Sequence, residues 1–486
     1  MTGIAPEPSG EERASLGTVV KRNLTWSFTN NIVGRVGNLA VGAVLLRILS
    51  PSDYGVYAVA LVAVTVPLSL NDLGIAPLIV RYRGNLERIG PTATSIILGF
   101  SGVLFALAML FAPAFASAMG AASATQLVRV AALALLIDAI GAVPTVAITR
   151  ALEQHKRTVA DVGGSIVGWA LSIVLAVLGA GAWSLVLGLL VGNLITTVTV
   201  IVLAPARFRP GFDREVAREL IHEGLPLAGS SMLVIGILWV DYIVVGLVLG
   251  DKELGFYLLA FNLSSWPINL VATAIRRVSL VGFARLKTSE EALDAGFRRG
   301  LTLTLAATLP ACVALSVYAR QVITFVYGDQ WVHAADALRW LALLGAVRIA
   351  LDVAWDLLVA VGRGKSVLWL NLLWFVLLVA GLTAGAHIAG IGGVGAAHLL
   401  VALVFVTPPY LIAIHRERIR LWRLARMLIR PAIGSCLVAL SALVAVNVVD
   451  GAFWQLVVGG SISLVAYGIV VAPLRGLWNQ STAVNP

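Results

Sequence analysis

This sequence is poor in charge and in cysteine. Asp, Glu, Lys and Arg together make up 12% of its 486 residues, whereas hydrophobic residues make up 59%. Soluble domains carry about 25% charged residues, so the composition excludes an ordinary soluble domain and favours a chain embedded in lipid. The two cysteines, Cys312 and Cys436, both fall in apolar stretches. That placement argues against a structural disulfide and excludes a metal site built on cysteine.

Motifs of the common enzyme chemistries are also missing. No cluster of His, Glu and Cys has the spacing of metal ligands, no Gly-x-Ser-x-Gly nucleophile elbow occurs, and no P-loop is present. The segment GRGKS at 362–366 lacks the earlier glycine that a P-loop requires. We therefore expect neither an enzyme, nor a cofactor, nor direct ATP hydrolysis.

What the sequence does contain is long apolar runs. A hydrocarbon core of roughly 30 Å takes about 20 residues of helix, and fourteen runs reach that length. We predict membrane spans at residues 24–48, 55–80, 92–117, 127–149, 162–180, 183–204, 225–249, 255–275, 300–319, 336–361, 367–387, 392–414, 431–449 and 453–473. The predicted fold class is an all-α polytopic membrane protein with 14 transmembrane helices.

Lys and Arg fall almost entirely in every second loop between these spans. If the amino terminus is cytoplasmic, 28 of the 35 basic residues lie in inside segments and four lie in outside loops, namely Arg47, Arg129, Lys252 and Arg320. This pattern predicts that both termini are cytoplasmic. It also explains the net charge of +10 by topology and contact with anionic lipid, and it gives no support to nucleic-acid binding. The first 20 residues show no apolar run before a small-residue cleavage site, so we expect no removed signal peptide.

Two pairs of similar segments indicate an internal repeat. LSPSDYGVYAVA at 49–60 and LGDKELGFYLLA at 249–260 share Leu, a short polar turn, Gly, Tyr and Ala at an offset of 200 residues. GAGAWSLVLG, starting at Gly179, and GIGGVGAAHL, starting at Gly390, both place a Gly-rich outer turn before a span. Six spans thus form one lobe, six form a second lobe of the same orientation, and two follow as an extension.

The cytoplasmic connections divide the chain further. The connection between the two lobes has Phe212, Val216 and Leu220 at helical spacing. The connection between the second lobe and the last two spans places Trp422 among six arginines. We therefore expect both connections to lie on the inner leaflet. The predicted parts are a cytoplasmic tail at 1–20, an N-lobe at 21–204, a cytoplasmic linker at 205–224, a C-lobe at 225–414, a basic interfacial linker at 415–430, the last two spans at 431–474 and a cytoplasmic tail at 475–486.

Polar side chains inside the spans are candidates for function, because each unpaired charge there costs about 2.5–3.5 kcal/mol. In the first span Asn31, Arg35 and Asn38 share one helix face, which suits an aqueous cavity that receives an anion. Arg35 is about 11 residues into the span, too deep to reach a headgroup region easily. A structural charge is the alternative interpretation of Arg35.

The eighth span repeats this arrangement with Asn262, Trp266, Asn269, Thr273 and Arg276 on one face, and a proline after Trp266 can kink the helix. We predict that these residues line the substrate cavity, although Arg276 lies near the inner end and could instead extend to lipid headgroups.

Six further charged residues inside spans are candidates for ion coupling or charge pairing. They are Asp72, Asp138, Asp241, Arg348, Asp352 and Asp356. The spacing of four between Arg348 and Asp352 favours a structural ion pair within one helix. Asp138 and Asp241 could each pair with a neighbouring arginine or hold a proton or cation.

Three motifs carry a resemblance to a known family. LRILSPSDYGVYAVA at 46–60, LNDLGIAPLIVR at 70–81 and GDQWVHAADALRWLALL at 328–344, within a layout of two six-span lobes plus two spans, resemble the polysaccharide transporter branch of the multidrug/oligosaccharidyl-lipid/polysaccharide exporter superfamily. The resemblance covers roughly residues 20–475. It implies two lobes around a central cationic cavity that opens alternately to each side of the bacterial inner membrane.

The function that this resemblance implies is a flippase for a lipid-linked oligosaccharide, usually carried on undecaprenyl pyrophosphate. Its expected partners are that glycan, membrane lipid, H⁺ or Na⁺, and polysaccharide polymerase machinery. Three alternatives stay open: a lipid II flippase, a cation-coupled drug antiporter, and an outer-face glycosyltransferase or polymerase. Short outer loops of roughly 20 residues at most argue against the last of these.

Overall fold

The computed structural model describes residues 26, 30, 33–82, 86–205, 209–286 and 289–472, and these described residues form helices and turns without any strand. The all-helical part of the predicted fold class is therefore confirmed. Helices are expected in lipid because they satisfy every backbone hydrogen bond within one segment. Two compact units divide the chain, Met1–Ile235 and Gly236–Pro486, which we call unit 1 and unit 2.

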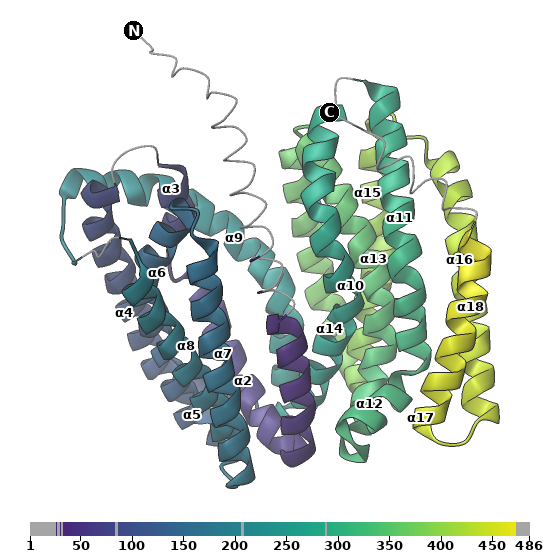
Figure 1. The fold of residues 1–486 in the computed structure, drawn as a ribbon, viewed down its shortest axis with the longest axis horizontal. Helices are drawn as coiled ribbons and strands as arrows, with labels where there is room; N and C mark the ends of the chain where they lie inside the picture. Colours follow the sequence, from purple (N-terminus) through teal and green to yellow (C-terminus); the bar gives the residue numbers. More distant parts are fainter. Residues whose placement is uncertain are drawn as a thin grey trace. The chain divides into compact units, whose positions relative to one another are not determined.

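Unit 1 holds the first helices and part of α9 (Figure 1). Its elements are a helix over 33–48, α2 (Pro51–Leu70), α3 (Ile75–Arg81), α4 (Leu86–Ala118), the short 3-10 helix η1 (Ala122–Ala124), α5 (Thr125–Ala131), α6 (Leu133–Arg150), α7 (Gln154–Val177), α8 (Ala182–Leu203) and α9 (Arg214–Leu249), which continues into unit 2.

Unit 2 holds the remaining helices. They are α10 (Asp251–Leu286), α11 (Glu290–Val317), α12 (Ala319–Tyr327), the 3-10 helix η2 (Asp329–Ala334), α13 (Ala335–Ala360), α14 (Gly364–Leu400), the π-helix η3 (Val401–Val406), α15 (Thr407–Arg416), α16 (Leu421–Val448), α17 (Ala452–Trp454), the π-helix η4 (Gln455–Gly459) and α18 (Gly460–Val471).

Local sequence explains where several helices begin. Ser50 caps α2, because its hydroxyl accepts from the Asp53 amide while the Asp53 carboxylate accepts from the Ser50 amide. α10 begins after Gly250, whose φ of 87° suits glycine. α14 contains a break at Ala389 and Gly390, where φ is −146° and 56°. This break lies where the sequence predicts a Gly-rich outer turn.

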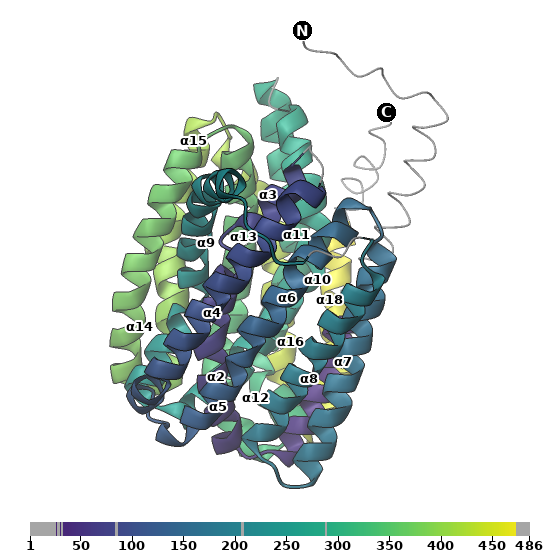
Figure 2. The same ribbon diagram turned by 90° about the vertical axis from the view of Figure 1, so that its left-hand side faces the viewer.

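Helices α7 and α8 pack closely through glycine (Figures 1 and 2). Gly164 and Gly168 on α7 face Gly188 and Gly192 on α8. A Cβ atom added to Gly168 would lie 2.6 Å from the carbonyl oxygen of Gly188. Small residues at such spacing let two membrane helices approach until their backbones touch.

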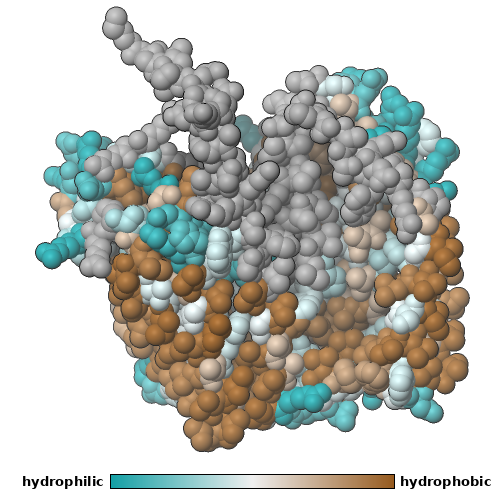
Figure 3. Space-filling view, viewed as in Figure 1, coloured by the Kyte–Doolittle hydropathy of each residue, from teal (hydrophilic) through white to brown (hydrophobic). Residues whose placement is uncertain are grey.

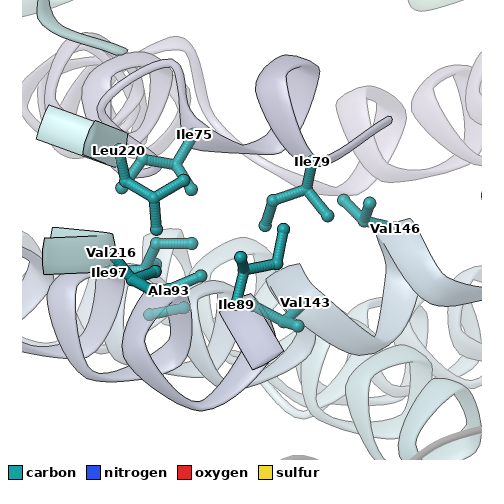
Figure 4. Close-up of a cluster of buried hydrophobic side chains, with 10 residues drawn as sticks. Ile75, Ile79, Ile89, Ala93, Ile97, Val143, Val146, Val216 and Leu220 are labelled. Carbon is teal, nitrogen blue, oxygen red and sulfur yellow. The ribbon is translucent and has the colours of Figure 1, made fainter. Parts of the chain in front are cut away.

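A cluster of buried aliphatic side chains joins four elements of unit 1 (Figure 4). Ile75 and Ile79 of α3 meet Ile97 of α4, and Val216 and Leu220 bring in the first turns of α9. The stripe that the sequence assigns to an interfacial helix is thus partly buried in this cluster. Phe212 precedes α9 and is 73% exposed.

Nine helical stretches of the described residues are long and apolar enough to cross a membrane. One of them, Gly364–Arg416, spans 53 residues and contains the break in α14, so it holds two predicted spans. Another, Pro51–Val80, combines α2 and α3. Figure 3 shows hydrophobic side chains over much of the drawn face of unit 2 near α16 and α18, with hydrophilic ones toward the helix ends. The chain is therefore a multi-pass membrane protein.

Candidate functional site

The polar face of the first helix contacts α7 in unit 1. The Trp169 indole N–H donates to the Asn38 side-chain oxygen over 3.0 Å. Asn30 donates to the Asp161 carboxylate over 2.9 Å, and Arg157 lies 3.7 Å from the same carboxylate. Asn38, which belongs to the predicted stripe of the first span, is exposed, and its side chain is hydrogen-bonded to Trp169.

Arg35, the central residue of that stripe, is half-buried on the same helix. Asn31 lies outside the described residues. The contact with α7 adds Trp169 to the candidate residues, which the sequence alone did not single out. An indole held by an amide offers a ring face for stacking next to hydrogen-bonding groups.

A second polar group of unit 1 surrounds Asn71. This buried side chain donates to Asp138 over 3.1 Å and to the Leu135 carbonyl over 3.0 Å, and it accepts from the Ser101 hydroxyl over 2.6 Å. The Asp72 carboxylate accepts from the Gly74 amide over 3.0 Å and so shapes the turn before α3. These contacts give Asp72 and Asp138 structural partners without testing a role in ion coupling.

The predicted stripe of α10 is described in part. Asn262 is exposed and Trp266 is half-buried. Pro267 lies inside α10, where it removes one backbone donor. The side chains of Asn269, Thr273 and Arg276 lie outside the described part of the structure.

Among the described charged groups of unit 2, the most deeply buried is the Asp241 carboxylate on α9, which has 0% exposure. The Tyr257 hydroxyl of α10 donates to one of its oxygens over 3.0 Å, and the Tyr242 amide donates to the other over 3.1 Å. Tyr242 also meets the rings of Tyr257 and Phe261 edge to face, at centroid distances of 5.8 and 5.2 Å. Aromatic rings therefore shield this carboxylate from solvent.

Two basic side chains complete this group. His398 of α14 is 3% exposed, and its Nδ1 atom lies 3.9 Å from the Asp241 carboxylate, which is too far for a hydrogen bond. Arg348 of α13 acts electrostatically on both residues, and its guanidinium carbon lies 5.6 Å from the centre of the Phe261 ring. We call Asp241, Tyr257, Arg348 and His398 the unit 2 polar centre.

The acids that follow Arg348 on α13 differ in burial. Asp352 is half-buried and interacts electrostatically with Tyr410, whose hydroxyl lies 3.4 Å from the side-chain oxygen of Asn371. Asp356 is 3% exposed. The ion pair that the spacing predicts between Arg348 and Asp352 stays a prediction.

The unit 2 polar centre brings one acid, one base, one fixed cation and one tyrosine hydroxyl together from four helices. The carboxylate and the imidazole are close enough to exchange a proton after a small movement, while the guanidinium offsets a negative charge on the carboxylate. No group of three or more His, Cys, Asp or Glu among the described residues could hold a metal ion. The sequence singles out Asp241 and Arg348 as candidates for ion coupling or charge pairing, whereas only the structure shows that Tyr257 and His398 belong to the same group.

Comparisons with known proteins identify a family and several relatives. The sequence model of a family described as polysaccharide biosynthesis protein matches residues 44–336. The succinoglycan biosynthesis transport protein ExoT of Rhizobium meliloti (strain 1021) is 25% identical over 76% of this chain and 73% of its own length. The lipopolysaccharide biosynthesis protein WzxC of Escherichia coli (strain K12) is 23% identical over 80% of each chain.

A solved structure shares the fold. The inward closed conformation of the lipid II flippase MurJ matches with a TM-score of 0.75 at 15% identity, over 93% of this chain and 99% of that chain. The resemblance to the polysaccharide transporter branch that the three motifs predict is therefore confirmed.

Proposed function

Because this chain belongs to the polysaccharide biosynthesis protein family, we propose that it is a flippase that moves a lipid-linked oligosaccharide across the bacterial inner membrane. The single observation that carries the proposal is the family match over residues 44–336. ExoT is a succinoglycan biosynthesis transport protein and WzxC is a lipopolysaccharide biosynthesis protein, which supports a polysaccharide precursor as the substrate class. Undecaprenyl pyrophosphate is the proposed carrier, and alternating access is the proposed mechanism.

The proposed topology has fourteen spans in two parallel six-helix repeats plus two, with both termini in the cytoplasm. It is supported by the distribution of 28 basic residues inside and four outside. The repeat is supported by the placement of its segments, since 49–60 and 249–260 each contain a helix start, at Pro51 and Asp251.

The proposed substrate residues are those of the two predicted stripes, Asn31, Arg35, Asn38, Asn262, Trp266, Asn269, Thr273 and Arg276. A pyrophosphate with sugars is too polar to cross lipid unaided, so guanidinium and amide groups must replace its hydration. Trp169 joins them because its indole holds Asn38 in place. Arg35 is the proposed ligand of the pyrophosphate.

The unit 2 polar centre is the proposed place of coupling to H⁺ or Na⁺. Asp241 and His398 are buried side by side, and a buried carboxylate is stable only when it is hydrogen-bonded or neutralised. Uptake of one proton or cation there changes the net charge of the centre, which can favour one conformation of unit 2 over another.

Replacement of Arg35 tests the proposed substrate role. Because a guanidinium holds phosphate oxygens bidentately and an ammonium acts as a point charge, we expect Arg35→Lys to lose part of the transport and Arg35→Ala to lose most of it. The measurement is surface glycan in cells that lack their own copy, together with accumulation of the lipid-linked precursor in the inner leaflet. Normal surface glycan with well-expressed Arg35→Ala protein would leave Arg35 as a structural charge.

The same cells separate the main alternative from the proposal. If the protein restored growth to cells deprived of their lipid II flippase and had no effect on surface glycan, it would be a lipid II flippase. The fold likeness to MurJ alone does not distinguish the two functions.

A further inference from the structure

The start of α16 presents an exposed aromatic ring that is close to two arginines. Trp422 is 58% exposed. The guanidinium carbon of Arg423 lies 5.5 Å from the centre of its ring, and that of Arg426 lies 5.0 Å from it. Both distances are within the range of a cation–π interaction. Two positive charges are thus held at one exposed aromatic side chain.

This arrangement is anchored to the rest of unit 2. The Asp294 carboxylate of α11, which is 5% exposed, accepts from the backbone amide of Arg420 over 2.9 Å. The same carboxylate accepts from the Arg298 guanidinium over 3.1 and 2.9 Å, and Arg298 also contacts the Met427 sulfur at 3.6 Å. The first two turns of α16 are therefore fixed on α11 by partly buried polar contacts.

The nearby carboxylates already face other arginines. Glu417 lies 2.7 Å from Arg363, and Glu290 lies 3.8 Å from Arg418. No carboxylate of the residues that the structure describes lies within ion-pair distance of Arg423 or Arg426. The charge at the Trp422 ring is accordingly available to an anion from outside the chain.

An apolar stripe continues from these charges along α16. Ile429 and Ile433 are 52% and 51% exposed, and with Trp422 and Arg426 they follow at helical spacings of four, three and four. α16 lies beside α18 in unit 2 (Figure 1). A ligand on this face would meet guanidinium groups at one end and aliphatic side chains along its length.

We propose that Trp422, Arg423 and Arg426 bind the phosphate of an anionic phospholipid whose acyl chain lies along Ile429 and Ile433. Guanidinium groups bind phosphate oxygens through paired hydrogen bonds, and tryptophan is typical of the membrane–water interface. Phosphatidylglycerol has both required parts, a negative headgroup and an acyl chain. The site uses none of the proposed substrate residues, and it depends on the proposed topology only for its location in the cytoplasmic leaflet.

Binding of phosphatidylglycerol to the full chain tests the proposal. Lipid is titrated into purified protein in a neutral detergent, and bound lipid is counted by native mass spectrometry, with phosphatidylcholine as the neutral probe. We expect Arg423→Gln/Arg426→Gln to weaken phosphatidylglycerol binding about thirtyfold, roughly fivefold for each lost charge, and to leave phosphatidylcholine binding unchanged. We expect Trp422→Phe to retain most of the binding and Trp422→Ala to lose several-fold.

The matched control removes the same two charges elsewhere. Arg214 and Arg218 are exposed near the start of α9, so Arg214→Gln/Arg218→Gln changes the net charge equally. Equal loss of binding in both double variants would show attraction to overall charge and overturn the site. Undecaprenyl pyrophosphate is added as a competitor. If it bound at Arg423 and Arg426 while phosphatidylglycerol did not, the face would belong to the substrate and the proposal would be wrong. Unchanged thermal unfolding of both double variants confirms that they fold.

Discussion

At the scale of single residues, the Asp241 carboxylate depends on its neighbours more than any exposed charge does. It has 0% exposure and accepts from the Tyr257 hydroxyl and the Tyr242 amide. A buried anion that loses one donor keeps its desolvation cost and loses the compensating bond. We therefore expect Tyr257 to contribute to the stability of the folded protein although its side chain is uncharged.

We predict that Tyr257→Phe lowers the free energy of unfolding by about 1–3 kcal/mol, because the hydrogen bond to Asp241 is lost while the ring still fills its space. Thermal unfolding in detergent measures the change. Tyr57→Phe is the matched control, since Tyr57 lies 200 residues before Tyr257, at the equivalent position of the proposed repeat, where Val41 takes the position of Asp241. Equal destabilisation by both substitutions would contradict the role of the bond.

The residue scale is also where prediction from sequence reached its limit. Asp241 and Arg348 could be singled out because charges inside apolar spans are costly. Tyr257 could not, because tyrosine is unremarkable in a span until its hydroxyl is seen to meet a carboxylate from another helix. A search for any histidine inside a span would have found His398. Trp169 could not be assigned to Asn38, since the two lie on different helices.

At the scale of elements, the glycines of α7 and α8 set the distance between the two helices. Without a hydrophobic force between helices in lipid, close backbone contact supplies much of the association. A side chain at Gly168 has no room, because its Cβ would lie 2.6 Å from the Gly188 carbonyl oxygen and 3.2 Å from the Cα of Gly192. The neighbouring atoms belong to the α8 backbone, which, unlike a flexible side chain, cannot move aside to make room.

We expect Gly168→Ala to lower the free energy of unfolding by about 1–3 kcal/mol, because α7 and α8 must separate to admit the methyl group. Gly163→Ala on the same helix is the control, since nothing lies within 4 Å of its added Cβ. That control should be neutral or slightly stabilising, given the higher helix propensity of alanine. Thermal unfolding of the two variants should differ clearly, and matching values would show that the helices adjust freely.

Most helices could be predicted from the length of the apolar runs and from the glycines and polar turns that separate these runs. The glycine before Asp251 and the Ser50 cap match the helix starts that the polar turns indicate. The junctions were harder. The linker at 205–224 contains the start of α9, which runs on without a break to Leu249. Its apolar residues Val216 and Leu220 fit an interfacial helix and a buried cluster equally well by periodicity, so only tertiary contacts decide between them.

At the scale of the whole molecule, equivalent positions of the proposed repeat have similar surroundings in their own units. The Asp53 carboxylate lies close to Gly181 in a Gly-rich turn, and a Cβ added there would be 2.6 Å from it. Its counterpart Glu253 lies 3.2 Å from His333, which lines a cavity of about 560 Å³ together with Gly390 of the other Gly-rich turn. Asp53 thus lies beside one Gly-rich turn, and the partner of Glu253 shares a cavity with the other. The proposed repeat assigns both turns to the outer side of the membrane.

The side of the membrane on which each connecting segment lies can be predicted from the basic residues. Segments 276–299 and 415–430 together hold twelve of them, whereas 320–332 holds one, Arg320. Because positive charges stay on the cytoplasmic side, we expect the first two segments inside the cell and the third outside. Single cysteines at position 288 or 329, in a background without Cys312 and Cys436, report this through labelling of intact cells with a membrane-impermeant maleimide. Position 329 should react in intact cells, and position 288 should react after the membrane is opened. Labelling of 288 in intact cells without labelling of 329 would reverse the orientation of the whole chain and place the Trp422 site in the opposite leaflet.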